Sequence, residues 1–315
     1  MITALAGGVG AARMLRGLVQ VVPADTVTAV VNTADDVVLH GLHVSPDLDT
    51  VTYTLAGAVN DDTGWGLAGE SWTVMESLER YSGQTWFRLG DRDLATHLYR
   101  TDRLQSGATL TEVTDEIRRA WGVGCRLLPM SDDPVRTVLT VEGVGEVGFQ
   151  DYFVARRHDV TVSAVRFAGA DAARPGPDVL SCIGDAEAVL VCPSNPIVSI
   201  GPLLAVAGVA DALRRARART VAVSPIVAGT ALKGPADRLM RELGHDASVV
   251  GVARLYAELA SVLVIDGADA DLAPQVEATG MACVVTDTVM SSPEVAAALA
   301  RRALSAVGAP PAPAR

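Results

Sequence analysis

The stretch ITALAGGVGA, residues Ile2–Ala11, decides the fold expected for this chain. Its first five residues form a continuous apolar and β-branched run, which predicts a buried strand. Gly7, Gly8 and Gly10 then predict a tight turn that leads into a helix. The first backbone N–H groups of such a helix can bind phosphate oxygens. The stretch therefore indicates the start of an α/β fold with an anion-binding turn.

Short β-branched runs alternate with helical patterns along the chain, which predicts a Rossmann-like, doubly wound α/β fold with a mostly parallel sheet. A mainly helical stretch and a hairpin, at 135–141 and 146–149, interrupt the alternation between about residues 70 and 180. We interpret this range as an inserted subdomain. Residues 1–307 are predicted to form a single α/β domain, and residues 308–315 a disordered tail. The expected strands of the main sheet are Ile2–Ala6, Val27–Val31, Ala188–Cys192, Thr220–Val223, Val262–Ile265 and Ala282–Val285.

The composition excludes several classes of protein. Hydrophobic residues make up 49% of the 315 residues and charged residues 20%, as in a globular protein. The net charge of −11 would repel a nucleic acid, and the densest basic group, at 214–219, has the spacing of a solvated helix face. No apolar run reaches the roughly 18 residues of a membrane-spanning helix, and the opening strand leaves no room for a signal peptide. The four cysteines form no CxxC pair, so we expect a cytoplasmic protein that binds neither nucleic acid nor membrane.

The glycine turn differs from two familiar phosphate-binding loops. Arg13 stands where a dinucleotide-binding fingerprint has its third glycine, and Asn32 ends the second strand where that fingerprint expects a ribose-binding acid. No Gly-Lys-Ser or Gly-Lys-Thr follows, so the turn is not a Walker P-loop. Two interpretations remain: an anion-binding turn with Arg13 facing a diphosphate, or a tight turn that binds nothing. The nearby acidic loops favour the first.

Two acidic loops follow the second expected strand. Asp35 and Asp36 lie just past its carboxyl end, and Asp47 and Asp49 lie one short loop later. Ligands of open parallel sheets bind in the crevice beyond these strand ends. Helix capping would explain Asp47 or Asp49 alone, but it cannot explain all four acids. Four carboxylates this close repel each other and a phosphate unless a hard divalent cation lies between them, so the sequence indicates phosphate chemistry that uses a metal.

Several motifs occur in a shared order between about residue 2 and residue 300. They are GGVG at 7–10, NTADD at 32–36, SPDLDT at 45–50, LGDRDLATH at 89–97, LPMSDD at 128–133, FQDYF at 149–153, PSNPIVSIGP at 193–202 and VSPI at 223–226. Each motif is modest evidence by itself. Together they make the chain resemble the 2-phospho-L-lactate transferase family of coenzyme F-420 biosynthesis.

The resemblance implies a reaction. A guanosine diphosphate-linked three-carbon acid gives its phospho-acid group to the ribityl hydroxyl of the deazaflavin Fo, releasing GMP and giving F-420-0 or dehydro-F-420-0. The resemblance also implies Mg²⁺ as cofactor and a homodimer. Lactyl, enolpyruvyl and glyceryl groups all remain open as the acid, with a tilt toward enolpyruvyl from the alanine- and arginine-rich composition. The alternatives are a non-catalytic regulator that binds a nucleotide sugar and a nicotinamide-dependent dehydrogenase, which Arg13 and Asn32 disfavour.

Resemblance and position together assign the expected site residues. Asp35 and Asp49 are expected to hold the metal and to be catalytic, with Asp49 orienting or deprotonating the attacking hydroxyl. Asp49, Thr50, Arg88 and Asp91 are expected to bind the deazaflavin, whereas His97 is as consistent with a structural role as with a catalytic one. The residues expected to bind the nucleotide and its phosphates are Gly7, Gly8, Gly10, Arg13, Ser194, Asn195 and Ser224.

Overall fold

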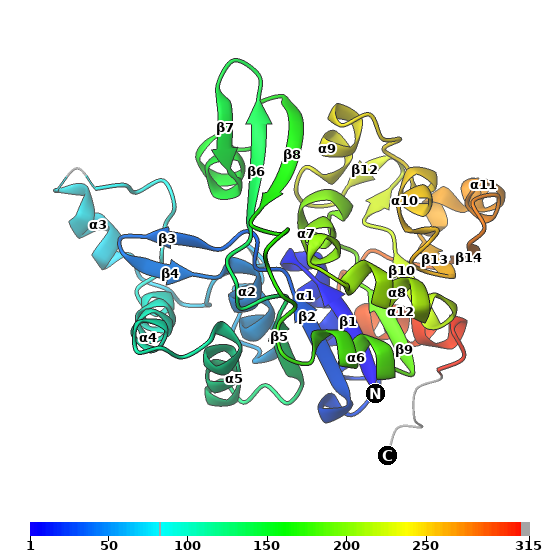
Figure 1. Cartoon of the computed structure of the whole chain (residues 1–315), viewed down its shortest axis with the longest axis horizontal. Coiled ribbons are helices and arrows are strands. Elements are labelled where there is room, and N and C mark those ends of the chain that lie inside the picture. Colours follow the sequence, from blue (N-terminus) through cyan, green and yellow to red (C-terminus); the bar gives the residue numbers. More distant parts are fainter. Residues whose placement is uncertain (82, 310–315) are drawn as a thin grey trace.

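The computed structural model describes residues 1–81 and 83–309. At its centre lies a seven-stranded sheet with the order β14-β13-β10-β9-β1-β2-β5, in which every neighbouring pair is parallel (Figure 1). The strands are β1 (Ile2–Ala6), β2 (Val27–Val31), β5 (Arg126–Pro129), β9 (Ala188–Val191), β10 (Thr220–Val223), β13 (Val262–Ile265) and β14 (Ala282–Val285). The predicted Rossmann-like, doubly wound α/β fold is therefore confirmed.

The strand order reverses between β1 and β9. The chain first builds the sheet from β1 toward β2 and β5, and then returns to add β9, β10, β13 and β14 on the other side of β1. The loops that leave β1 and β9 therefore turn away from each other. In open α/β sheets, this divergence leaves a ligand-binding crevice beyond the carboxyl ends of the strands.

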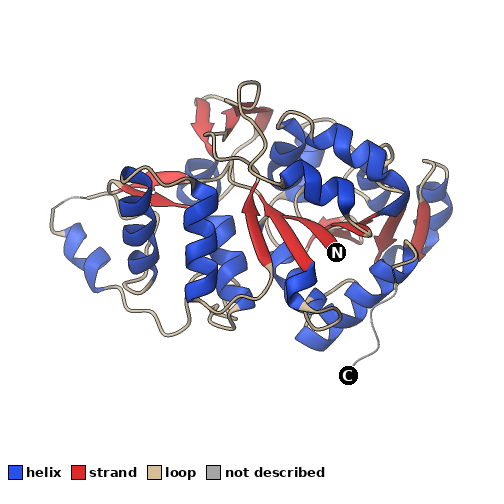
Figure 2. Cartoon of the chain, turned by 60° about the horizontal axis from the view of Figure 1, so that its bottom comes forward, coloured by secondary structure: helices blue, strands red, loops and turns tan. Residues whose placement is uncertain are grey.

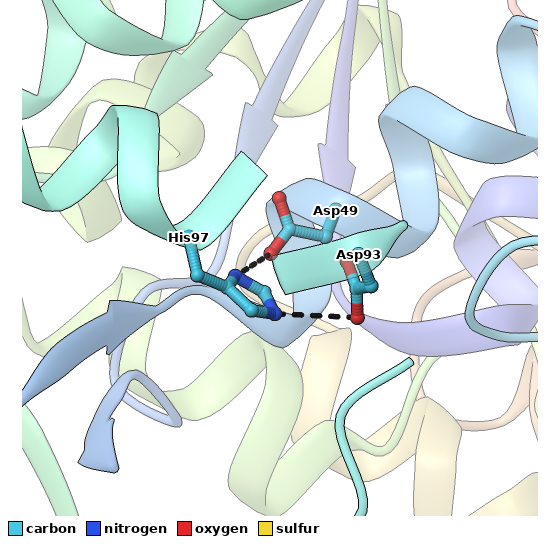
Figure 3. A group of neighbouring side chains, drawn as sticks. All are labelled: Asp49, Asp93 and His97. Atoms are coloured by element: carbon cyan, nitrogen blue, oxygen red, sulfur yellow. Dashed lines mark ion pairs between the residues drawn. The ribbon is translucent and has the colours of Figure 1, made fainter. Parts of the chain in front are cut away.

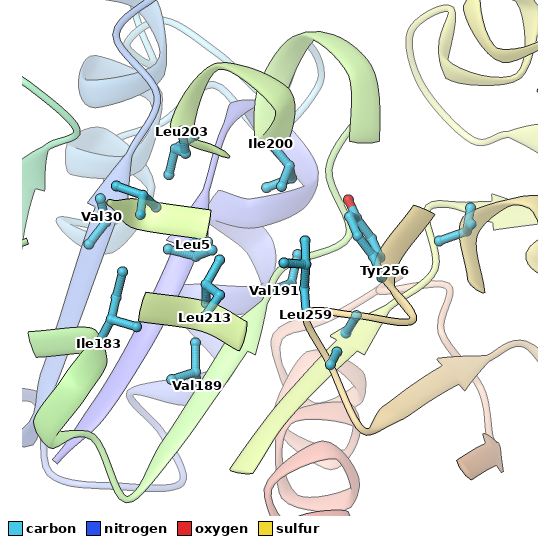
Figure 4. Close-up of a cluster of buried hydrophobic side chains, with 14 of the residues drawn as sticks. Leu5, Val30, Ile183, Val189, Val191, Ile200, Leu203, Leu213, Tyr256 and Leu259 are labelled. Atoms are coloured by element: carbon cyan, nitrogen blue, oxygen red, sulfur yellow. The ribbon is translucent and has the colours of Figure 1, made fainter. Parts of the chain in front are cut away.

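Helices cover both faces of the sheet. Successive residues of a strand point to opposite faces, so alternate residues enter two separate hydrophobic clusters, one on each face. Leu5 and Val191 belong to the cluster drawn in Figure 4, whereas Ala4 and Leu190 belong to the cluster on the other face. The helices of the first cluster are α6 (Val179–Asp185), α7 (Gly201–Ala205), α8 (Val209–Ala216) and α10 (Val249–Tyr256). Those of the second are α1 (Gly8–Leu18), α2 (Pro46–Leu55) and α12 (Pro293–Ala306), and Figure 2 shows helices on both sides of the strands.

Two further structures lie outside the central sheet. One consists of a hairpin and three helices, at the left of Figure 1: β3 (Val37–Leu39), β4 (Leu42–Val44), α3 (Thr73–Glu79), α4 (Asp93–Gln105) and α5 (Leu110–Ala120). The other is an antiparallel sheet, at the top of the view: β7 (Gly145–Gly148), β6 (Arg136–Val141) and β8 (Val162–Ala168). The predicted hairpin is confirmed as β6 and β7, and β8 adds a strand that the sequence pattern did not predict.

The range of about 70–180, predicted to form an inserted subdomain, also contributes a strand to the central sheet. β5 comes from this range, and its residues pair with Thr28–Val31 of β2. Four residues that begin with arginine and end with proline carry too little periodicity to predict a strand. Pro129 is tolerated there because β5 is the edge strand.

Short elements complete the described chain. They are the helical turns η1 (Ala24–Thr26), η2 (Asp151–Ala155), η3 (Pro196–Ile200), η4 (Arg217–Arg219) and η5 (Gly267–Leu272), the strands β11 (Ile226–Val227) and β12 (Thr230–Ala231), and the helices α9 (Ala236–Glu242) and α11 (Ala273–Glu277). Of the tail predicted at 308–315, residues 310–315 lie outside the described residues. Across 1–81 and 83–309, no single helix has the length and apolar character to cross a membrane, and one pair, Pro196–Ala205 with Val209–Arg219, reaches them only jointly across a 99° bend.

Candidate active site

A cleft of about 500 Å³ opens at the switch point of the sheet. Its walls come from the loops that follow β1, β2, β9 and β10, from the first turn of α2 and from the loop before α9. The structure therefore brings together most of the predicted site residues, although they lie far apart in the sequence. Those that line the cleft are Gly7, Gly8, Gly10, Arg13, Asp35, Asp49, Thr50, Arg88, Ser194, Asn195 and Ser224.

The glycine turn is shaped by close packing as well as by its exposed N–H groups. Gly8 has φ of +71°, a left-handed conformation that favours glycine. A Cβ atom on Gly10 would lie 2.2 Å from the Pro193 carbonyl oxygen, so the turn packs directly against the loop after β9. The Gly8 N–H donates to Asp47 Oδ1 at 2.9 Å. A carboxylate thus occupies one donor that the sequence assigns to a phosphate.

Asp35 and Asp47 form the first acidic set of the cleft. The Asn32 side-chain amide donates to Asp35 Oδ2 at 3.1 Å and to Asp47 Oδ2 at 3.0 Å. Burial, and then the charge of Asp47, raise the pKa of Asp35 well above its ordinary value. Burial also raises the pKa of Asp47 to about 6. Asp36 does not line this cleft, and its Oδ2 accepts a hydrogen bond from Ser45 Oγ at 2.6 Å.

This first set lacks a positive charge. Within residues 1–81 and 83–309, no basic side chain forms an ion pair with Asp35 or Asp47, and the buried Asp35 Oδ1 has no hydrogen-bond partner. Carboxylate oxygens are the ligands that Mg²⁺ prefers in proteins. A bound cation would also offset the burial that raises the pKa of both acids and the repulsion by Asp47 that further raises the pKa of Asp35. The set therefore fits the expected metal chemically.

Asp49 belongs to a second, differently balanced set. Arg100 contacts both of its carboxylate oxygens: Nη1 lies 3.1 Å from Oδ2, and Nη2 bonds to Oδ1. His97 lies between two acids, with Nδ1 3.7 Å from Asp49 Oδ2 and Nε2 3.2 Å from Asp93 Oδ2 (Figure 3). The Tyr53 hydroxyl donates to Asp93 Oδ1 at 2.6 Å. Asp49 is 5% exposed, and Arg100 is 2% exposed.

The charges of the second set stabilise one another. Burial lowers the pKa of Arg100, but the charge and hydrogen bonds of Asp49 outweigh it, so the guanidinium stays charged. Burial raises the pKa of Asp93, but the hydrogen bond and charge of His97 bring the net pKa below its ordinary value. Asp49, Asp93 and His97 offer ligand atoms within 4.8 Å of one another and could also hold a metal. The histidine nitrogen makes this set less suited to Mg²⁺ than the all-oxygen pair of Asp35 and Asp47.

The residues predicted to contact the nucleotide shape the cleft through local hydrogen bonds. Ser194 Oγ donates to the Gly7 carbonyl oxygen at 2.9 Å and joins the two loops at the switch point. Asn195 Oδ1 accepts from the N–H groups of Ile197 and Val198, so it caps η3. Ser224 Oγ donates to the carbonyl oxygen of the residue two positions later, at 3.0 Å.

Arg88 and Asp91, both predicted to bind the deazaflavin, differ in location. The Arg88 guanidinium lines the cleft and lies 4.5 Å from the centroid of the Trp72 ring, a cation–π contact. Asp91 is absent from the lining of the cleft. Its carboxylate accepts from the N–H groups of Thr73 and Val74, each at 3.0 Å. The structure thus assigns Asp91 to the start of α3.

The fold and the cleft together define a Rossmann-like α/β protein whose switch point joins a glycine turn to two sets of buried carboxylates. The chain belongs to the 2-phospho-L-lactate transferase CofD family, whose sequence model matches residues 2–302. It is 44% identical to the phosphoenolpyruvate transferase of Kitasatospora aureofaciens, over 96% of this chain and 97% of that protein. It is also 44% identical to the phosphoenolpyruvate transferase of Streptomyces griseus subsp. griseus, with the same coverage. The family predicted from the motifs is confirmed.

Solved structures share the fold at lower sequence identity. Two crystal structures of the protein BH3568 from Bacillus halodurans, described as a member of the UPF0052 family, superpose with TM-scores of 0.62 and 0.59. The first covers 96% of this chain and 99% of that one, the second 91% and 92%, and both are 17% identical in sequence. They support the architecture alone.

Proposed function

We propose that this chain transfers a phospho-acid group from a guanosine diphosphate-linked donor to the ribityl hydroxyl of the deazaflavin Fo. The group is 2-phospho-L-lactyl or enolpyruvyl phosphate, the released nucleotide is GMP, and the product is F-420-0 or dehydro-F-420-0. Family membership supports a transferase of this kind. The name of the two relatives that are 44% identical, phosphoenolpyruvate transferase, favours the enolpyruvyl group.

One structural observation carries the proposal. A buried carboxylate, Asp49, which pairs with Arg100, lies in the same cleft as the glycine turn and the charge-unbalanced pair of Asp35 and Asp47. In the proposed reaction the Fo hydroxyl oxygen forms a bond to the phosphorus that bears the acid. The bond from that phosphorus to the bridging oxygen breaks, GMP leaves, and the hydroxyl loses its proton. Asp49 is the acceptor for this proton or for the hydrogen bond that orients it.

The remaining residues bind and orient the substrates. Mg²⁺, held by Asp35 together with Asp47 or Asp49, would neutralise the charge of the diphosphate oxygens. We assign the diphosphate to the glycine turn and Arg13, and the guanosine to the wall formed by the loops after β9 and β10, with Ser194, Asn195 and Ser224. We assign Fo to the wall formed by Thr50 and Arg88, and we expect a homodimer.

The proposal is tested by mass spectrometry of the product. The purified chain is incubated with Fo, Mg²⁺ and, in separate reactions, the lactyl, enolpyruvyl or glyceryl derivative of guanosine diphosphate. We expect dehydro-F-420-0 from the enolpyruvyl donor, together with GMP. Absence of a deazaflavin phosphodiester with all three donors would overturn the proposal. Tight binding of a UDP-sugar without binding of Fo would then favour a regulatory protein.

A further inference from the structure

Lys233 is the only lysine in this chain, because all the other residues among its 26 Lys and Arg are arginines. It lies in the loop between β12 and α9, and this loop forms one wall of the cleft. A chain that otherwise uses arginine throughout thus has its single primary amine on a side chain at the candidate active site.

The Lys233 ammonium lies beside the glycine turn. Its Nζ donates to the Thr63 carbonyl oxygen at 2.9 Å, which links the loop before α9 to the loop around residues 60–66. A Cβ atom on Gly64 would lie 3.1 Å from Lys233 Nζ and 2.8 Å from Val9 Cγ1. Lys233 Nζ and Val9 Cγ1 therefore both lie close to Gly64, and Val9 belongs to the glycine turn.

The charge at this position is not balanced by an acid. In the part of the chain that the structure describes, neither Lys233 nor Arg13 forms an ion pair, although both line the cleft. Burial, and then the charge of Arg13, lower the pKa of Lys233. An ammonium has three N–H donors, and the contact with Thr63 uses one of them. Two cations in the same cleft, neither paired with an acid among the described residues and with N–H donors still available, indicate an anionic ligand.

The shape of the site explains why lysine suits it. Gly64 has φ of +79° and no side chain, and the ammonium packs against the space where a side chain would begin. A guanidinium is planar and larger, whereas an ammonium is a compact point charge that binds phosphate oxygens from many directions. The close approach of Lys233 Nζ to Gly64 therefore favours the compact ammonium over a guanidinium.

We propose that Lys233, together with Arg13, binds the phosphate groups of a nucleoside diphosphate at the glycine turn, and so connects the loop around residues 60–66 to the bound donor. This inference rests on the proposed function for the identity of the donor. It adds a binding residue that the sequence motifs do not include. The contact with Thr63 makes both loops part of the donor site.

Chemical labelling tests the inference on the unmodified full chain. Lys233 and the N-terminal amine of Met1 are the two primary amines, so an amine-acetylating reagent gives two products that peptide mass spectrometry separates. Met1 pairs with Glu187 on the surface at 2.8 Å and serves as an internal control. With GDP and Mg²⁺, we expect the acetylation rate of Lys233 to fall about tenfold or more, while that of Met1 is unchanged. Binding of GDP, seen by calorimetry, without protection of Lys233 would overturn the inference and leave the proposed function intact.

Variants supply the second test. Lys233→Met should weaken GDP binding about tenfold, with unchanged affinity for Fo, and Lys233→Arg should bind GDP with intermediate affinity because it keeps the charge and loses the fit. Arg16→Met is the matched control: Arg16 lies on the same helix as Arg13 and pairs with Asp61 at 3.3 Å, outside the lining of the cleft. Equal GDP affinity in Lys233→Met and the unmodified chain would refute the role of Lys233. Failure of GDP to bind the unmodified chain would refute the proposed function as well.

Discussion

The two acidic sets of the cleft each contain two aspartates, but they differ in charge balance. Asp49 is matched by Arg100, with His97 and Asp93 beside it, so the second set carries its own counter-charges. Asp35 and Asp47 share only the neutral amide of Asn32. Asp35, Asp47 and Asp49 lie within fifteen residues, and the sequence alone would give them one role.

The charge of Asp49 is compensated within the protein by Arg100, whereas compensation of the charge of Asp35 and Asp47 depends on a bound ligand. A buried ion pair is costly to break, because removal of one partner leaves an uncompensated charge in the interior. A buried pair of acids without a counter-charge has the opposite property: it is costly to keep ionised until a cation binds. We therefore expect substitutions in the two sets to affect stability in opposite directions while both reduce turnover.

The largest effect is expected for Asp49→Asn. The substitution removes the acceptor for the attacking hydroxyl and leaves Arg100 buried without its partner. We expect kcat to fall by about 10³-fold or more. The free energy of unfolding should decrease by about 3–5 kcal/mol. Product formation with Fo and urea unfolding measure the two effects.

A charge-balanced double variant controls for misfolding. Asp49→Asn combined with Arg100→Met removes both charges of the ion pair, so much of the lost stability should return while turnover stays absent. Turnover near the normal level in the stable double variant would show that Asp49 has no role in the reaction.

Asp35→Asn should give the contrasting result. Neutralising one acid of the unbalanced pair removes both its desolvation cost and its repulsion with Asp47. In metal-free buffer we expect the free energy of unfolding to rise by about 1 kcal/mol. Turnover should fall by about 100-fold, with weaker binding of Mg²⁺ seen by calorimetry. A loss of stability as large as that of Asp49→Asn would erase the distinction between the two sets.

The pH dependence of stability sharpens the same distinction. The pKa of Asp47 is raised to about 6 in the folded protein, whereas an unfolded aspartate titrates near 4. The folded chain therefore binds more protons than the unfolded chain between about pH 4 and pH 6, and its free energy of unfolding falls as the pH rises through this range. In metal-free buffer, the unmodified chain should lose stability relative to Asp47→Asn from pH 4 to pH 6. Thermal unfolding at several pH values measures this difference, and a constant difference would contradict the raised pKa.

Much of the fold could be predicted because local sequence determines it. Continuous apolar runs such as Val262–Ile265 predict strands that are buried on both faces, and the left-handed conformation at Gly8 needs a glycine whatever the surroundings. β5 could not be predicted, because its four residues form a strand only by pairing with the edge of β2. The β3–β4 hairpin was missed because its short strands form only by pairing with each other.

The sequence predicted site residues only where residues of one type lie close together in the chain. Four acids within fifteen residues indicate Asp35 and Asp49, but Arg100 lies 51 residues after Asp49, and their contact depends on how α4 packs. One signal could have found it: Asp93, His97 and Arg100 have the spacing of a single helix face. For Lys233, the signal is its uniqueness in the composition.

The smallest effect is expected for Asp91→Ala, which tests an acid that belongs to neither set. Asp91 begins α3 by accepting two backbone N–H groups, and its removal leaves these donors to water. We expect the unfolding temperature to fall by about 2 °C and the dissociation constant for Fo to be unchanged. Arg88→Ala is the matched comparison: Arg88 is three residues away in the sequence and lines the cleft, so its loss should weaken binding of Fo. If Asp91→Ala weakened Fo binding as much as Arg88→Ala, then α3 or Asp91 itself would contact the deazaflavin, and the boundary of the site would extend beyond the cleft.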